Sequence, residues 1–144
     1  MDIQDCIKFA NEHHTCYLAT VEGDQPRVRA LGMWFADKTG FYFHSQSVKA
    51  LCKQLKKNAK VEVVFHAQEE KPLGRVMRVA GKAEFCDDME LKKKSYEARP
   101  FLKGMGIKGP EDPMVAVFRI HTGEAHFWTG KSSMYEDDIE KIKF

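Results

Sequence analysis

The chain has 144 residues, 23 of them Lys or Arg and 21 Asp or Glu, which gives a formal net charge of +2. This length is typical of one domain with a real core and is short for two large ones, so we expect a single domain over residues 1–144. Charges of both signs are interspersed along the chain. The composition therefore predicts no polyanion-binding surface, and we expect no nucleic-acid partner.

The four cysteines are widely spaced and form no Cys-x-x-Cys pair: Cys6, Cys16, Cys52 and Cys86. Such spacing favours neither a zinc site nor a disulfide framework, and it suits small apolar residues of a core. The first residues lack the basic-then-apolar order of a signal peptide, and no apolar run approaches the ~20 residues that span a bilayer. We therefore expect a cytoplasmic protein with reduced thiols, no metal and no membrane partner.

Hydrophobic spacing predicts a helix at the start of the chain and a hairpin after it. Apolar residues repeat at the spacing of one helix face from Asp2 to about His14. Tyr17–Val21 and the run from Gln25 are rich in β-forming residues, and turn residues 22–24 separate them.

The next two predicted strands carry the first candidate binding residues. Arg27 and Arg29 are two positions apart in the predicted strand Gln25–Phe35, so their side chains share a face. A turn over Asp37–Gly40 then leads into a second extended run, Phe41–His44.

A short helix is predicted directly after this strand, extending to Lys57. Its apolar face is Val48, Leu51, Cys52 and Leu55. Ser45 or Ser47 is the expected N-cap, and Lys49 falls in the first turn, where the helix dipole opposes a cation by roughly 0.3–1 kcal/mol. Free N–H groups at a helix start favour an anion, and Arg29 and Lys49 would add charge-assisted bonds. The segment therefore indicates a phosphate-binding site. A capped surface helix with a solvated Lys49 fits the same residues.

The second half of the chain predicts more strands and one helix. Alternating apolar residues predict strands at Val61–His66 and Arg75–Phe85, the second with a bulge or a bend at Gly81, and a connection over Gln68–Gly74 joins them. Acidic residues at its start favour a helix over Asp87–Ala98.

The last strands are predicted as a hairpin, Met114–Ile120 and Glu124–Trp128, around the turn His121-Thr122-Gly123. About six strands in hairpins, with helices between and beside them, predict a mainly β protein of the α+β class. Its sheet should be an antiparallel barrel or a curled sheet rather than parallel βαβ units.

Residues Gly104–Gly109 match the pattern G-x-G-x-x-G. A dinucleotide fingerprint needs a strand before it and a helix after it, whereas prolines flank this segment on both sides. The expected structure is a loop.

Four segments together resemble the pyridoxamine 5'-phosphate oxidase-like proteins, the FMN-binding split barrels. They are Gln25 to Trp34, Phe43 to Ala50, Val79 to Glu84 and Phe127 to Gly130. Their order and spacing span most of the chain. The resemblance implies an antiparallel split β-barrel, FMN as cofactor, and a homodimer that holds the cofactor at the subunit interface.

The resemblance also implies roles for residues in these segments. Arg29 and Lys49 occupy the positions of phosphate-binding cations, with Ser47 beside them, and His44 and Ser45 lie near the phosphate and ribityl chain. The flavin would lie along Leu31, Gly32, Met33 and Trp34, and Trp128 would approach it from the partner subunit.

The chain departs at two positions from the family's FMN-binding pattern and in one segment from the vitamin B6 oxidase itself. Val48 stands where the family often has arginine, and Val76 where a glutamine commonly contacts FMN. The segment Lys131–Asp138 is acidic where the oxidase has an arginine, a histidine and a second arginine for its substrate. Because acidic side chains would repel a phosphorylated substrate, we expect that pyridoxamine 5'-phosphate is not the substrate.

The resemblance implies an FMN-dependent oxidoreductase of small molecules, such as the nitroimidazole reductase-like branch. NAD(P)H or another donor would supply electrons to a small-molecule acceptor. No catalytic side chain is identified, since Trp34 and Trp128 are equally explained by packing. The sequence leaves open a flavin-binding electron carrier without catalysis, a haem-binding split barrel and a nucleic-acid-binding small barrel.

Overall fold

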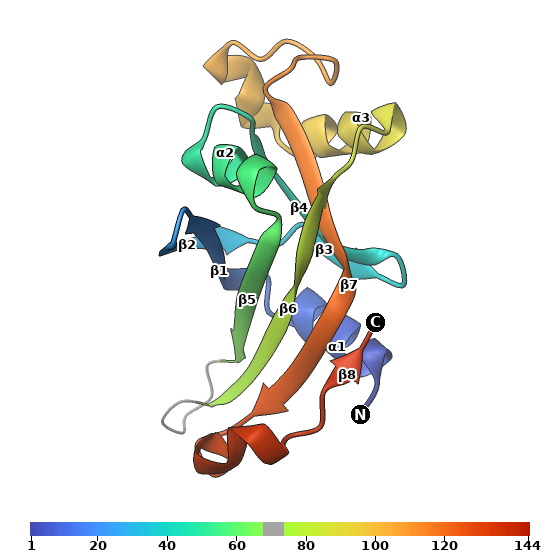
Figure 1. Ribbon diagram of the computed structural model, residues 1–144. Helices are drawn as coiled ribbons and strands as arrows, with labels where there is room; N and C mark the ends of the chain where they lie inside the picture. The colour runs from blue at the N-terminus through green and yellow to red at the C-terminus, as the bar shows by residue number, and fades with distance from the viewer. Residues whose placement is uncertain (68–73) are drawn as a thin grey trace.

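The computed structural model describes residues 1–67 and 74–144 as an antiparallel sheet with most of the helices near its two ends and the first helix beside it (Figure 1). The strands are β1 (Thr15–Glu22), β2 (Gln25–Gly32), β3 (Phe35–Asp37), β4 (Gly40–Gln46), β5 (Lys60–Ala67), β6 (Arg75–Phe85), β7 (Val115–Trp128) and β8 (Ile142–Lys143). The helices are α1 (Ile3–Glu12), α2 (Ala50–Lys57), α3 (Met89–Glu97) and the 3-10 helices η1 (Pro100–Met105) and η2 (Ser133–Asp138). Most of the connection predicted over 68–74 lies outside the described residues.

The strands form one sheet in the order β2-β1-β5-β6-β7-β4-β3, with β8 paired to β7, and every described pairing is antiparallel. The order β2 to β3 does not close on itself in the described part of the chain. The predicted antiparallel, mainly β architecture is confirmed. The expected number of about six strands was too low, because the Gln25 run divides into β2 and β3 and β8 adds a short strand.

The predicted final hairpin is wrong: β7 runs without interruption through His121-Thr122-Gly123. A Cβ on Gly123 would lie 2.1 Å from the Ala80 carbonyl oxygen, and one on Gly81 would lie 2.5 Å from the Thr122 oxygen. The register between β6 and β7 shifts between Gly81 and Ala83, which confirms the predicted bulge. The glycines therefore permit a close approach of two backbones rather than a turn.

Large aromatic side chains fill the main core. The fully buried ones are Phe41, Phe43, Phe65 and Phe118, and the rings of Phe43 and Phe118 stack with centroids 5.1 Å apart. Burial of each such side chain contributes ~1.5–3 kcal/mol. The capping box formed by Asp2 and Asp5 starts α1, which packs its apolar face on this core.

All four cysteines were predicted to be core residues; Cys6, Cys16 and Cys52 are buried, whereas Cys86 is only partly buried. Burial raises the pKa of Cys16 to about 12, so this thiol is not a nucleophile at neutral pH.

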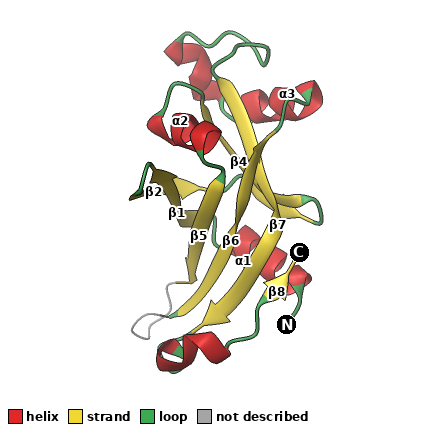
Figure 2. Ribbon diagram, in the orientation of Figure 1, coloured by secondary structure: helices red, strands yellow, loops and turns green. Residues whose placement is uncertain are grey.

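The helices α2, α3 and η1 lie near one end of the sheet (Figure 2). A second small core of Leu102, Ile107 and Val115 with Tyr96 attaches η1 to β7. The helix predicted over 87–98 is confirmed, with Asp88 as its N-cap. The expected loop at Gly104–Gly109 is only partly correct, because Gly104 lies in η1 and Gly106 ends it. Among the described helices, none combines the length and apolar character needed to cross a bilayer.

Candidate functional site

A cavity of about 740 Å³ opens between β2, β4, the start of α2, and η1. Six of the ten residues predicted from the sequence line it: Arg29, Leu31, Gly32, His44, Ser45 and Lys49. The strands and helix that carry them are separated along the chain, and the sheet brings them to one place. The other four, Met33, Trp34, Ser47 and Trp128, are not part of this lining.

The start of α2 faces the cavity without a capping side chain. Lys49 is the N-cap residue, and its side chain makes no cap hydrogen bond. The prediction that Ser45 or Ser47 caps the helix is wrong, because Ser45 pairs with Ala116 inside the sheet and the Ser47 N–H donates to the Met114 carbonyl. Backbone donors of the first turn therefore remain for an anion, beside the lining residue Ala50.

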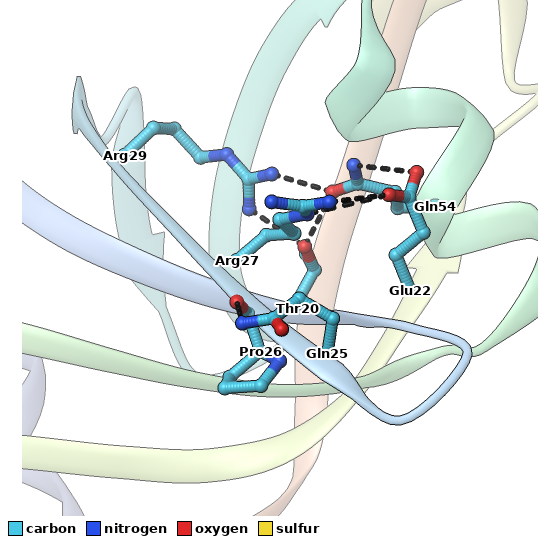
Figure 3. A network of polar contacts seen from close by, with 7 residues as sticks. All are labelled: Thr20, Glu22, Gln25, Pro26, Arg27, Arg29 and Gln54. Carbon is cyan, nitrogen blue, oxygen red and sulfur yellow. Dashed lines mark hydrogen bonds and ion pairs between the residues drawn. The ribbon is translucent and has the colours of Figure 1, made fainter.

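Arg29 is held at the cavity wall by neighbours on β1 and α2 (Figure 3). Its Nη1 donates to Thr20 Oγ1 at 2.8 Å and to the Leu18 carbonyl at 3.3 Å, and its Nη2 donates to Gln54 Oε1 at 2.5 Å. Burial lowers the pKa of Arg29, although a guanidinium stays charged in proteins. Arg27 shares its side of β2 but pairs with Glu22 instead.

Arg99 is a cavity residue that the sequence analysis missed. Its side chain is 6% exposed. Its Nη2 donates to Ser95 Oγ at 2.9 Å, and its Nε donates to the Ser95 carbonyl at 3.3 Å. Arg99-Pro100 reads in sequence as the end of a helix, so no local pattern shows that this arginine is buried.

His44 contacts the same serine, Ser95. Its Nδ1 lies 3.1 Å from Ser95 Oγ. Burial, reinforced by the positive charge of Arg99, lowers the pKa of His44 to about 4, so the ring is neutral at pH 7. Ser95 Oγ accepts a hydrogen bond from Arg99 and can donate its own hydroxyl hydrogen to His44 Nδ1. In the tautomer that accepts this bond, the imidazole hydrogen is on Nε2, which is then a donor.

Met33 and Trp34 lie beside the cavity wall. Met33 is buried in the main core. The ring of Trp34 stacks on His44 with centroids 4.9 Å apart, so it fixes the plane of a lining residue. Ser47 occupies the turn that leads into α2.

The cavity is electropositive. Arg29, Lys49 and Arg99 line it, and none of its described lining residues is Asp or Glu. Within the described part of the chain, none of these three cations lies within ion-pair distance of a carboxylate. Uncompensated cations beside free helix N–H groups fit the phosphate of a nucleotide. No group of three potential metal ligands occurs in the described residues.

Trp128 lies elsewhere, at the far end of β7, where it pairs with Val76. It lines a separate hollow of about 480 Å³ together with Tyr17 and Val28, and Val28 is 70% exposed. Its indole Nε1 is buried and has no hydrogen-bond partner among the described residues.

The acidic segment at 131–138 includes η2, which is attached to the sheet. Glu136 pairs with Arg78 and lies 3.1 Å from His126 Nε2. This carboxylate is not among the residues that line the electropositive cavity.

Comparisons with known proteins agree with this architecture. The family model described as pyridoxamine 5'-phosphate oxidase matches residues 3–129. A NimC/NimA family protein from Clostridium acetobutylicum is 32% identical, with a TM-score of 0.76 over 98% of this chain and 92% of that one. Among the curated proteins, no match was found.

Two more distant structures share the fold. PhzG from Burkholderia lata, in complex with tetrahydrophenazine-1-carboxylic acid, has a TM-score of 0.72 at 16% identity, over 99% of this chain and 89% of that one. A FAD-binding protein from Mesorhizobium loti has a TM-score of 0.67 at 18% identity, over 88% and 94%. The chain therefore belongs to the pyridoxamine 5'-phosphate oxidase-like family and has its split-barrel fold, without being the vitamin B6 oxidase itself.

Proposed function

We propose that the protein binds FMN in the electropositive cavity and acts as an FMN-dependent oxidoreductase of small molecules. The observation that carries this proposal is the set of three cations, Arg29, Lys49 and Arg99, that line one cavity without a carboxylate among its described lining residues. Arg99 is buried and Arg29 is partly buried, while Lys49 is exposed at the cavity rim. Burial of an unpaired cation is unfavourable, so buried cations without a carboxylate partner are expected where a ligand brings negative charge.

The residues present fit the phosphate end of FMN. Arg29 and Lys49 would donate to the phosphate oxygens, together with N–H groups of the first turn of α2. Ser45 and neutral His44 would donate to the ribityl chain, and the segment from Leu31 to Trp34 would lie along the flavin. A bound flavin supplies the transfer of a hydride or electrons, and the chain orients it and excludes water.

The mouth of the cavity suits a small planar acceptor. Phe101 and Met105 line it and are each 58% exposed, which leaves apolar surface beside the site. Arg99 Nη1 has no partner among the described residues and would favour an acceptor with an anionic or electron-rich group. A nitroimidazole reductase-like activity is our specific proposal within this class, and the 32% identity to a NimC/NimA family protein supports it.

We also propose that two copies of the chain complete the site. Trp128 lies in a hollow separate from the cavity, within an apolar surface that includes Val28. A homodimer would cover this surface and would bring Trp128 of one subunit toward the cavity of the other.

The first test is the identity of the bound chromophore. Purified protein should be yellow, and the denatured supernatant should release FMN rather than FAD or haem. A red protein would indicate haem, and a protein that takes up no flavin when it is supplied would contradict the proposal.

The second test separates an enzyme from a carrier. Stopped-flow mixing with NADH or NADPH should reduce the flavin, and a nitroimidazole or another small acceptor should reoxidise it with turnover. Reduction without turnover on any acceptor in the panel would favour an electron carrier.

A further inference from the structure

Gln54 is a polar residue on the buried face of α2. The other buried residues of this helix are Leu51, Cys52 and Leu55, while Gln54 is 6% exposed. Burial of an amide is unfavourable unless it is hydrogen-bonded, and methionine or leucine has a similar size. Packing alone therefore does not explain the glutamine.

Both ends of the Gln54 amide are occupied. Its Oε1 accepts from Arg29 Nη2 at 2.5 Å and from Thr20 Oγ1 at 2.6 Å. Its Nε2 donates to Glu22 Oε2 at 3.3 Å, and the other oxygen of Glu22 accepts from Arg27 at 3.0 Å. The result is a chain of hydrogen bonds that runs from Arg27 through Glu22 and Gln54 to Arg29 (Figure 3).

The charges of Arg29 and Glu22 fix which way the amide points. In the opposite orientation the Gln54 NH₂ group would face the guanidinium, and its oxygen would face the carboxylate. Both contacts would be repulsive. Glu22 therefore orients Gln54, and Gln54 in turn orients Arg29.

The same contacts leave one edge of Arg29 open. A guanidinium has five N–H groups: Nη1 donates to Thr20 and to the Leu18 carbonyl, and Nη2 donates to Gln54. The side edge, made of Nε–H and the second Nη2–H, has no partner among the described residues, and Arg29 lines the cavity. Two parallel N–H groups match two oxygens of a phosphate.

We propose that Gln54, oriented by Glu22, is a positioning residue that holds the side edge of Arg29 toward the phosphate of the bound flavin nucleotide. This inference rests on the proposed function. Gln54 itself does not line the cavity, so its effect on the ligand passes through Arg29. A purely structural role would change the binding of every flavin alike, whereas a positioning role changes only the part of the affinity that depends on the phosphate.

The ratio of FMN to riboflavin affinity measures that part, because riboflavin lacks the phosphate. We would titrate both flavins into Gln54→Met, Glu22→Gln and, as a control, Gln25→Met. The control makes the same change at an exposed glutamine whose side chain donates to the Pro26 carbonyl. The readout is the dissociation constant from flavin fluorescence.

Gln54→Met should raise the dissociation constant of FMN about tenfold and leave that of riboflavin within about twofold. Glu22→Gln should raise the FMN constant about threefold, since a neutral partner holds the amide less firmly. Gln25→Met should change neither constant.

An equal change for both flavins in Gln54→Met, or no change, would overturn the inference while leaving the proposed function intact. If wild-type protein binds neither flavin, the proposed function fails and the inference with it. Should Gln54→Met not fold, Glu22→Gln decides, because it alters an exposed carboxylate. An unchanged FMN constant in that variant would then overturn the inference.

Discussion

Two regions of the molecule carry cations beside the sheet, and they differ in whether a carboxylate pairs with those cations. At the cavity, Arg29, Lys49 and Arg99 have no carboxylate within ion-pair distance in the described chain. Along β5 and β6, Arg78 pairs with both Glu62 and Glu136. The paired arginine holds the protein's own segments together, whereas the unpaired set is what a site for an anion requires.

The largest expected effect comes from removing a cavity cation. Arg29→Ala and Lys49→Ala should each weaken FMN binding by about 1.5–3 kcal/mol, the range for hydrogen bonds to charged groups. Thr20 and Gln54 remain bonded to each other without Arg29, so the fold should persist. Titration with FMN measures the effect, and unchanged affinity in both variants would contradict the proposed site.

The next effect is a pH dependence of stability from His44. Its pKa is lowered from 6.5 to about 4 in the folded protein, first by burial and then by Arg99. The unfolded chain therefore binds the proton more readily, and stability should fall as the pH drops from about 6.5 to about 4. We expect roughly 1–2 kcal/mol, allowing for solvent near the partly buried ring.

Denaturant unfolding of wild type and His44→Asn at pH 7 and pH 4.5 measures this contribution. The difference between the two pH values should be smaller in the variant. Equal differences in both proteins would show that His44 is not the residue responsible.

Arg78→Met tests the region in which the arginine is paired with carboxylates. Loss of its ion pairs with Glu62 and Glu136 should lower the free energy of unfolding by about 1 kcal/mol, because both pairs are partly solvated. The ratio of FMN to riboflavin affinity should not change. A change in that ratio would mean that the phosphate site extends to this region.

Salt should produce the smallest of these effects. FMN affinity should fall by a few-fold between about 0.05 and 0.5 M NaCl, because ions screen the charges of the phosphate and the cavity cations. Riboflavin affinity should stay nearly constant over the same range, and a parallel loss would argue against an electrostatic phosphate site.

Sequence periodicity predicted most of the elements, because it records which face of an element is buried. It failed at His121-Thr122-Gly123, where the residues have turn chemistry but Gly123 serves the close approach of β7 to β6. Whether such residues form a turn or continue a strand that closely approaches its neighbour depends on the neighbouring strand. The local sequence carries no information about that strand.

In the candidate site, too, some residues were predictable from local sequence and others were not. Arg29 and Lys49 were predicted from strand alternation and helix spacing, and both line the cavity. Arg99, Ser95 and Gln54 were missed, since their roles arise only when α2 and α3 pack beside the sheet. Gln54 did carry one signal, a polar residue among apolar positions on the buried face of a helix.

The uncapped start of α2 has a consequence for the dynamics of the protein. Without a side chain to hold them, the amides of Ala50 and Leu51 are expected to exchange their hydrogens with solvent through local fraying. An anion at this end would restrain them, so exchange there should slow on loading. The midpoint of thermal unfolding should also rise with the concentration of free FMN, because FMN would bind only the folded protein, in which this turn is ordered.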